Sequence, residues 1–390
     1  MSYIEKLLDG VTVKWKSLKS VSLVTIGEFV HKNKQNPNAN YPVFNGGTSP
    51  TGYYDIYNNL GNKIIVSARG ANAGFVNRIS EPYWAGNSCY SIAINDTTKL
   101  NWIFIFYYLK NSEDKLIDNQ QTGSIPAISK KQIENFQIPI PPLHVQEEIV
   151  RVLDTFTELT TELTTELTAR KKQYEYYRDK LLTFDDSVEW KTLGELTRIY
   201  SASRVHKNEW TTSGVPFYRT SDVISIFNGV KNSRDAAFIS HELYATLSSK
   251  SGKIQKDDIL VTGGGTIGIP YIVTTDEPLY FKDADLLCIQ KNKSLNSKFL
   301  YHFFLSTMFR TYLDNITHNA TIAHYTITQI AKTPVPVPPV AEQERIVAIL
   351  DKFDALTNSI TEGLPREIEL RKQQYEYYRD MLLTFPKVEK

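Results

Sequence analysis

Cysteine is scarce in this chain of 390 residues, which holds only Cys89 and Cys288. Two cysteines without a paired spacing argue against a disulfide framework and against a zinc site, and they are typical of a protein in a reducing cytoplasm. The seven histidines are scattered and show no metal-ligand spacing. We therefore expect a cytoplasmic protein with no metal site of its own.

Long hydrophobic runs are also missing. The longest uninterrupted one is Trp102–Leu109, whereas a helix needs roughly 20 apolar residues to cross a bilayer. The first ten residues, MSYIEKLLDG, include acidic side chains and no basic start before a long apolar stretch. We therefore expect neither a membrane span nor a secretory signal.

Catalytic motifs are the third absence. The sequence GGGTIG at 263–268 lacks the Gly-Lys-Ser/Thr ending of a phosphate-binding loop, so a tight turn explains it better. No Asn/Asp-Pro-Pro-aromatic motif and no Rossmann-type glycine cluster marks an adenine methyltransferase. We expect a chain that is not catalytic by itself.

What the chain does contain is a long internal duplication. RKKQYEYYRDKLLTF at 170–184 returns as RKQQYEYYRDMLLTF at 371–385. Upstream, IPIPPLHVQEEIVRVLDTFTEL at 138–159 matches VPVPPVAEQERIVAILDKFDAL at 335–356. Copies this long divide the protein into two equivalent halves.

Each copy predicts a long helix after a proline-rich entry. Alternate prolines followed by Pro-Pro forbid a central strand and favour an extended segment, and helix is expected from Gln146 to Phe184, about 58 Å at about 1.5 Å per residue. Apolar residues then recur at spacings of three and four, which is typical of a coiled-coil seam. The seam residues are Ile149, Val152, Phe156, Leu159 and Leu163 in the first copy and Ile346, Ile349, Phe353, Leu356 and Ile360 in the second. We expect the two helices to pack on each other.

The copies differ in length between their matched parts. The first has TELT three times over at Thr157–Thr168, and the second is four residues longer there and contains Gly363 and Pro365. Four residues are about one helical turn, or about 6 Å. The glycine and proline predict a stop and a restart of the second helix, and the TELT stretch is interpreted as a spacer.

The remaining blocks match each other more loosely. KIIVSARGANAG at 63–74 aligns with DILVTGGGTIG at 258–268, and VKWKSL at 13–18 aligns with VEWKTLGEL at 188–196. Short alternating strands, frequent turn residues and one or two short helices indicate an α+β domain that occurs twice with different loops.

These patterns predict four segments. Net charge alternates along them, at +4, −4, +3 and −2 for residues 1–137, 138–187, 188–334 and 335–390. The first and third are expected to be globular, and the second and fourth helical. Residues 1–10 are expected to pack with the helix ends, because their Lys-Leu-Leu repeats the Lys-Leu-Leu at 180–182.

The helical blocks, with their TELT repeats and Tyr-rich ends, closely resemble those of type I restriction-modification specificity subunits. The likeness is strongest to the class with tandem TELT- or TAEL-like tetrapeptides in its central helix, the type IC-like class. The resemblance implies two target recognition domains, each reading one half of a bipartite DNA site, separated by two long antiparallel helices with a pseudo-twofold internal repeat. It also implies two docked modification subunits for adenine methylation, and restriction subunits. No cofactor is expected on this chain; the resemblance places S-adenosylmethionine on the modification subunit, and ATP and magnesium on the restriction subunit.

Candidate contacts follow from residue type, because polar loop side chains can reach groove edges and tyrosine and arginine are common interface anchors. For DNA they are Asn45, Thr48, Ser49, Tyr53, Arg69, Asn72, Gln120, Gln121, Thr122, Ser124, Ser203, Arg204, Lys207, Tyr218, Arg219, Thr220, Ser221, Thr266, His318 and Asn319. For subunit docking they are Tyr174, Tyr177, Arg178, Tyr375, Tyr378 and Arg379. Any single one of them can instead serve turn chemistry, packing or solvated surface.

Two other functions stay open at this point. A standalone DNA-modifying enzyme is disfavoured by the missing catalytic motifs. A coiled-coil adaptor that binds protein alone is disfavoured by the duplicated globular blocks and their basic excess.

Overall fold

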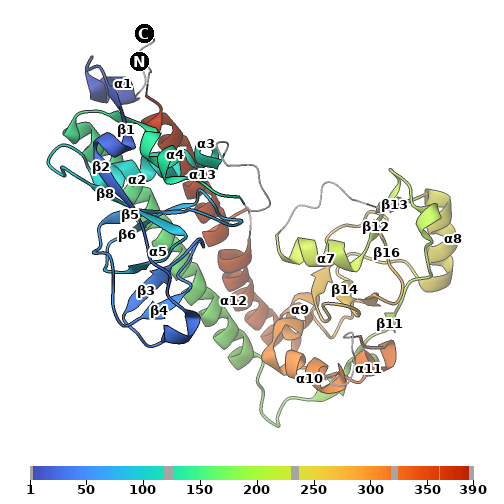
Figure 1. Cartoon of the computed structure of the whole chain (residues 1–390). Helices are drawn as coiled ribbons and strands as arrows, with labels where there is room; N and C mark the ends of the chain where they lie inside the picture. Colours follow the sequence, from blue (N-terminus) through green and yellow to red (C-terminus); the bar gives the residue numbers. More distant parts are fainter. Residues whose placement is uncertain (1–2, 118–125, 230–236, 318–323, 360, 386–390) are drawn as a thin grey trace. The chain divides into compact units, whose positions relative to one another are not determined.

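The computed structural model of the chain describes residues 3–117, 126–229, 237–317, 324–359 and 361–385 (Figure 1). The chain forms two compact units, one from Met1–Thr161 with Leu370–Lys390 and one from Glu162–Glu369. Each unit therefore combines one globular block with part of the long helix α5 (Leu143–Leu181) and part of the helices of the second copy. The boundaries of the two units differ from those of the four predicted segments, because each unit contains part of the long helices.

The first unit is mixed α and β. Its four-stranded sheet has the order β2-β8-β5-β6, its three-stranded sheet the order β4-β3-β7, and β1 pairs with β9. Besides its share of α5 and of α13 (Gly363–Leu383), its elements are α1 (Tyr3–Leu8), β1 (Lys14–Ser17), η1 (Leu18–Ser20), β2 (Ser22–Ile26), η2 (Lys32–Lys34), β3 (Tyr41–Phe44), β4 (Gly52–Tyr54), β5 (Lys63–Ser67), β6 (Val76–Ile79), β7 (Trp84–Ala85), β8 (Cys89–Ile94), α2 (Trp102–Lys110), α3 (Glu113–Ile117), α4 (Lys130–Asn135) and β9 (Gln137–Ile140).

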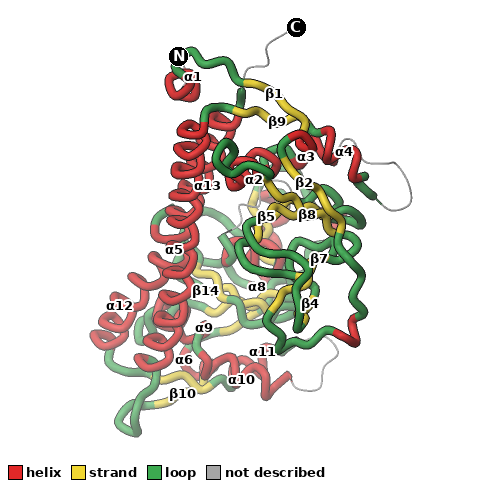
Figure 2. The backbone as a smooth tube through the Cα atoms, turned by 60° about the vertical axis from the view of Figure 1, so that its left-hand side comes forward, coloured by secondary structure: helices red, strands yellow, loops and turns green. Residues whose placement is uncertain are grey.

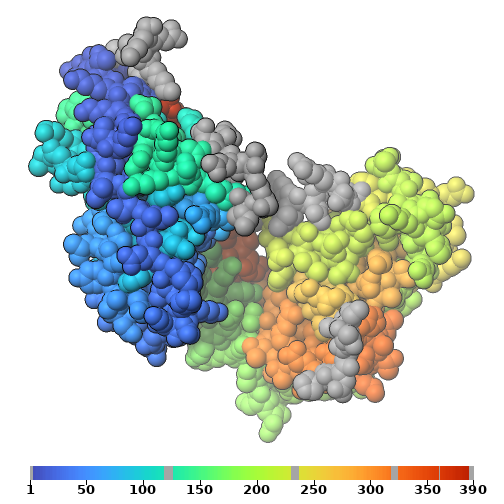
Figure 3. Space-filling model, in the orientation of Figure 1, coloured from blue at the N-terminus to red at the C-terminus, as the bar shows by residue number. Residues whose placement is uncertain are grey.

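The second unit repeats this plan. Its sheets have the orders β11-β17-β14-β15 and β13-β12-β16, and β10 pairs with β18. Its elements are β10 (Trp190–Thr192), α6 (Leu193–Leu196), β11 (Ile199–Tyr200), η3 (Lys207–Glu209), β12 (Val215–Tyr218), α7 (Thr220–Phe227), β13 (Ala237–Ile239), α8 (His241–Ser251), β14 (Ile259–Thr262), β15 (Pro270–Ile272), β16 (Tyr280–Phe281), β17 (Leu286–Ile289), α9 (Ser297–Leu305), α10 (Thr307–Thr317), α11 (Ile327–Ala331), β18 (Pro334–Pro336) and α12 (Val340–Asn358). The predicted α+β class and the internal repeat are confirmed, and the space-filling view shows each block as a packed body of its own (Figure 3).

The proline-rich entries form the outer strand of a two-stranded ladder in each unit. Trp15 lies opposite Pro139 and Lys191 opposite Val335, both in antiparallel register. Proline is tolerated because a strand in such a ladder has a partner on one side only. This ladder joins the start of each globular block to its end and so fixes where the long helix leaves the block.

One buried glutamine anchors each long helix to its block. Gln146 is fully buried and its amide donates to the carbonyls of Pro141 (2.8 Å) and Lys99 (3.2 Å), while its side-chain oxygen accepts from Asn101 N (2.8 Å). Gln343 makes the equivalent three bonds. The desolvation of a buried amide is offset only when its bonds are made. The predicted helix starts at this glutamine, whereas the observed helix begins three residues earlier, directly after Pro-Pro.

The long helices pack in an antiparallel and reciprocal way. In the first unit Phe156 stacks on Tyr378, with ring centroids 5.3 Å apart. In the second unit Phe353 stacks on Tyr177 at 5.6 Å. These residues exchange roles between the two copies, since the early phenylalanine of each copy meets the late tyrosine of the other. Figure 2 shows the start of α5 alongside the end of α13. The predicted seam is thus confirmed at its phenylalanines.

The two copies differ at the spacer, as expected. Helix α5 runs through all three TELT tetrads to Leu181 without interruption. In the second copy α12 ends at Asn358 and α13 begins at Gly363, whose φ of 77° favours glycine. Pro365 lies in the first turn of the new helix, where its missing N–H is not needed.

A second apolar face of α5 shares only Ile149 with the predicted seam. Val145, Ile149 and Leu153 are fully buried in the hydrophobic core of the first globular block. The N-terminal helix α1 adds Ile4 and Leu8 to the same core, which also holds the end of α13. Helix α5 therefore contacts its own block and a helix of the other copy at once. No described helix is both long and apolar enough to span a membrane.

Replacing Gln146 by alanine tests the anchor, with the cysteines as reporters of each unit. Cys89 and Cys288 are buried, one per unit, and burial raises the pKa of each thiol to about 12. We expect neither thiol to react with a thiol reagent in the native protein. Gln146→Ala leaves partners unsatisfied at a cost of about 2 kcal/mol, or about 30-fold in the opened population, and labelling of Cys89 followed by mass spectrometry should accelerate by that factor.

Glu147→Ala, at the exposed neighbour on the same helix, is the matched control and should leave the labelling rate of Cys89 unchanged. Gln343→Ala should instead accelerate the labelling of Cys288. Equal rates for Gln146→Ala and Glu147→Ala would contradict the anchoring role.

Candidate nucleic-acid interface

Each unit has an equivalent glycine-containing turn at the centre of its candidate interface. It follows the buried strand β5 in the first unit and β14 in the second, and glycines with positive φ, Gly70 and Gly265, form it. An isolated bridge joins Arg69 to Ala127 in the first unit and Gly264 to His324 in the second. Each turn thus meets the segment that enters from the end of its block. The repeat therefore builds one scaffold, with an arginine in one copy where the other has a glycine.

In the first unit this turn lies against a second polar loop. Ser67 Oγ donates to the carbonyl of Gly47 at 3.2 Å. A Cβ at Gly46 would lie 2.5 Å from the carbonyl oxygen of Arg69. The structure therefore brings together two groups of predicted residues that are distant in sequence.

The predicted side chains of these loops have different environments. Thr48, Ser49, Arg69 and Asn72 are exposed, and Tyr53 on β4 is 41% exposed. All five can reach a ligand outside the unit.

Asn45 differs from them, because its Oδ1 is buried without a hydrogen-bond partner in the part of the chain that the structure describes. Glycine at position 86 gives it room, since a Cβ there would lie 1.6 Å from Asn45 Oδ1. An unpaired amide oxygen is costly to bury, which sets Asn45 apart from the exposed residues of its loop.

In the second unit helix α7 takes the place of that polar loop. The loop follows β3 and leads to β4, and α7 follows the equivalent strand β12 and leads towards β13. Thr220 Oγ1 donates to the carbonyl of Asp285 (3.4 Å), which also accepts from Gly263 N (2.8 Å). Thr220 and the exposed Ser221 thus lie beside the turn that carries the exposed Thr266. The scaffold is shared and its inserts differ.

Arg219 is engaged by two side chains of its own block. Its guanidinium forms two hydrogen bonds with the carboxylate of Asp222, at 2.8 and 2.9 Å, and lies 5.6 Å from the ring of Trp210. These contacts hold the first turn of α7. Arg219 therefore supports the helix, and its contact with a base stays a prediction.

Two further predicted residues are partly enclosed. The backbone of Ser203 is held by the hydroxyl of Tyr280, and Tyr218 packs against Tyr271 at 5.6 Å, with burial raising the pKa of its phenol. Arg204 and Lys207, by contrast, are exposed. The remaining predicted residues, Gln120, Gln121, Thr122, Ser124, His318 and Asn319, lie outside the described residues.

Two of the six predicted docking residues are buried. Tyr174 is 4% and Arg178 9% exposed, and the Tyr174 hydroxyl lies 2.9 Å from His302 Nδ1. Both pack inside the second unit and cannot offer a surface. The most exposed aromatics of the repeat are instead Tyr176 and Tyr377, at 61% and 65%. Helical spacing could have identified them, because they fall on the side opposite the buried positions.

The other four docking candidates are partly accessible. Tyr177 and Tyr378 are each 37% exposed beside the prominent tyrosines, and their rings stack on the phenylalanines of the helix seam. Tyr375 and Arg379 are half-buried. These four residues pack the helices and only border a docking surface.

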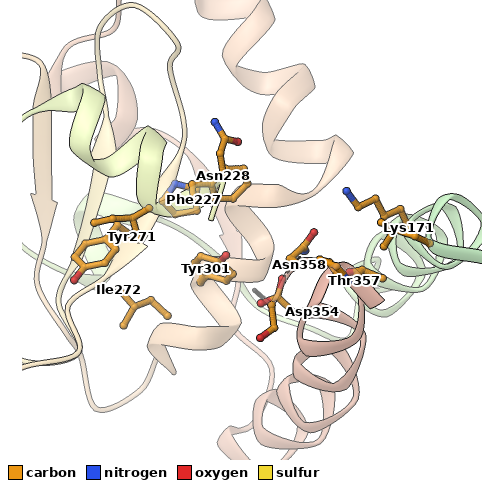
Figure 4. A pocket seen from close by; sticks show the side chains of 14 residues that line it. Lys171, Phe227, Asn228, Tyr271, Ile272, Tyr301, Asp354, Thr357 and Asn358 are labelled. Atoms are coloured by element: carbon orange, nitrogen blue, oxygen red, sulfur yellow. Dashed lines mark hydrogen bonds between the residues drawn. The ribbon is translucent and has the colours of Figure 1, made fainter. Parts of the chain in front are cut away.

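A cavity of about 500 Å³ lies elsewhere in the second unit, between the globular block and the helices (Figure 4). Phe227, Tyr271 and Tyr301 line one side, and Thr357 and Asn358 at the end of α12 line the other. Asn358 is engaged, because its amide donates to Asp354 at 2.8 Å. The cavity is formed where α12 stops, apart from the turns, so we do not count it as part of the interface.

Comparison with known proteins identifies the scaffold. The family described as "Type I restriction modification DNA specificity domain" matches this chain twice, over residues 11–171 and 186–370. A putative type I restriction enzyme specificity subunit of Haemophilus influenzae is 35% identical, with 98% of both chains covered. The EcoR124I/EcoR124II specificity subunit of Escherichia coli is 34% identical over 100% of this chain and 98% of its own.

A solved structure agrees on the fold. The S subunit of a type I restriction-modification system from M. genitalium aligns over 100% of both chains with a TM-score of 0.62 at 19% identity. At this identity the likeness shows the fold alone.

Adding a methyl group at Gly46 tests whether the two loops of the first unit touch as described. Gly46→Ala places a Cβ against backbone, which cannot swing away, so we expect a decrease of about 1–3 kcal/mol in stability. The measurement is the labelling rate of Cys89, which should rise. Gly47→Ala is the matched control, because its Cβ would meet only ordinary contacts of 3.4 Å or more. Equal labelling rates of Cys89 in the two variants would show that the loops are not in contact.

Proposed function

We propose, because this chain belongs to the type I restriction modification DNA specificity family, that each of its globular blocks reads one half of a bipartite DNA site. The observation that carries the proposal is the repeated turn with its bridge, at Arg69 and Ala127 and again at Gly264 and His324. Two equivalent scaffolds present different polar loops, as reading two different half-sites requires. Base edges are read by such side chains, whereas phosphate contacts only position the protein.

Arg69 is the strongest candidate for direct reading in the first unit. It is exposed and follows a rigid buried strand, and arginine can donate two bonds to the O6 and N7 of a guanine. The exposed loop residues Thr48, Ser49 and Asn72 lie on the same two loops. In the second unit Arg204, Lys207, Ser221 and Thr266 take the corresponding roles, with α7 in place of the loop.

The long helices set the gap between the half-sites. The boundary between the compact units falls at Thr161 and Glu162, within the TELT stretch of α5. A tetrad adds about 6 Å of helix, against about 3.4 Å per base pair. The length of this uninterrupted helix then fixes the number of unread base pairs.

The same helices dock the partners. Tyr176 and Tyr377 stand out at equivalent places of the two copies, so they suit two equal modification subunits. Large aromatic side chains are frequent interface anchors. The chain itself is not catalytic; methyl transfer to adenine, with its S-adenosylmethionine, belongs to the modification subunits, and ATP and magnesium to the restriction subunits.

Arg69→Ala should lower binding to one half-site only. Removal of a bidentate base contact costs about 1–3 kcal/mol, so we expect about a 5- to 160-fold weaker complex on the full site. Substituting the first half-site in the DNA should then have little further effect, whereas substituting the second should keep its full effect. Arg204→Ala should show the reverse pattern, in binding titrations with the modification subunits present. Equal sensitivity to both half-sites in either variant would contradict the assignment.

Deleting the tetrad Thr161–Thr164 should shorten the unread gap by one or two base pairs and leave both half-sites unchanged. Four residues rotate the helix by only about 40° beyond a full turn, so its faces are nearly kept. Methylation mapping of cells that carry the variant gives the gap directly. An unchanged gap in an active variant would rule out the helix as a ruler.

A further inference from the structure

Five exposed lysines form a patch on the second unit that the reading loops do not include. Lys291, Lys293 and Lys298 line a shallow cavity of about 540 Å³ with Asp257. Lys253 and Lys256 lie on the adjoining loop, where the carbonyl of Lys256 accepts a bond from Lys291 Nζ at 3.2 Å. We call these five residues the lysine patch.

The lysine patch lies at the opposite end of the sheet from the base-reading turn. Strand β14 begins directly after the loop with Lys256 and ends at Thr262, where the reading turn starts. Its neighbour β17 is antiparallel, so it begins beside that turn and ends next to Lys291. Four residues of strand separate the two ends by about 13 Å. Lysines at this distance do not belong to the set that reads bases.

The loops that carry the lysines are held in place by buried polar groups. Asp258 is 1% exposed, and its carboxylate accepts from Gln255 N and Lys291 N, both at 2.8 Å. Ser297 Oγ donates to the carbonyl of Asp257 at 2.6 Å. The backbone beneath the lysines is therefore preorganised.

The charges themselves are largely uncompensated. Lys298 pairs with Asp351, whereas Lys253, Lys256 and Lys293 form no ion pair with any described residue. Like charges gathered without partners raise the energy of the free protein and attract a polyanion.

The first unit shows that the fold does not require these lysines. Its equivalent loop before β5, NNLGN at 58–62, contains none. The stretch after β8, NDTTK at 95–99, contains only Lys99, which pairs with Asp96 at 2.8 Å. The lysine patch is thus an addition to one copy of a shared scaffold.

The composition of the patch indicates the class of partner. Protein interfaces are enriched in tyrosine, tryptophan and arginine and depleted in lysine. Phosphate backbones are bound by lysine and arginine through charge and release of counterions, without sequence preference. We propose that the lysine patch is a second DNA site, which binds phosphates of duplex DNA outside the half-site read by the turns; this rests on the proposed function only in that DNA is the ligand.

The test compares two triple variants of the full chain assembled with its modification subunits. Lys253, Lys256 and Lys293 are replaced by glutamine in one, and the exposed lysines Lys6, Lys19 and Lys332, which lie outside the turns and the long helices, in the other, so the change in net charge is equal. Each is titrated with a long duplex that carries the site found by methylation mapping and with one that lacks it, over a series of salt concentrations.

We expect the patch variant to bind both duplexes about tenfold more weakly at low salt, with an unchanged ratio between them. The slope of log affinity against log salt should become shallower by about 0.9 for each phosphate that the variant no longer neutralises. The control variant should behave as the unmodified assembly.

Equal decreases in affinity for the two variants would show a general charge effect and overturn the proposal. Weaker binding of the specific duplex alone would make the lysines part of base reading, and failure to assemble would make them a protein contact; either result also overturns it. If the unmodified assembly prefers neither duplex, the proposed reading function fails, while the duplex without the site still decides on the lysine patch.

Discussion

Burial of the apolar faces of helix α5 is the constraint on which the rest of the structure depends. A helix of 39 residues with apolar side chains on two faces is not stable alone in water. One face enters the core of the first block through Val145, Ile149 and Leu153, and the other meets the second copy through Phe156 and Tyr378. Because the second copy repeats the arrangement through Phe353 and Tyr177, the duplication supplies the partner that each helix lacks.

The architecture could be predicted from the sequence because the duplicated blocks are the parts with a strict physical requirement. The Pro-Pro entry, the buried glutamine and the Phe–Tyr pair each occur twice, so an interpretation of one copy could be compared with the other. The difference of four residues located the break of the second helix at Gly363. The second face of α5 was missed because Leu153 falls between seam positions, and its burial depends on a block distant in sequence.

The interface was less predictable, for a physical reason. Residue type selected Thr48, Arg69 and Asn72, which the structure places on exposed loops, but it could not show that Arg219 is already paired with Asp222. Nor could composition separate Tyr174, which is buried, from Tyr176, which is exposed. Whether a polar or aromatic side chain is free depends on its three-dimensional partners, which a pattern of single residues does not contain. The proposed specificity of the chain depends on those unrepeated parts.

In the proposed function, two equivalent domains read two separated half-sites, and this would leave a direct mark on DNA. The most direct measurement is a methylome, in which modified adenines are mapped across the genome of a cell that carries this chain with its modification subunit. We expect one motif made of two different half-sites, with a fixed gap of unread base pairs and a methylated adenine in each half. A single continuous motif, or methylation that does not depend on the exposed loops of both units, would contradict the two-domain mechanism.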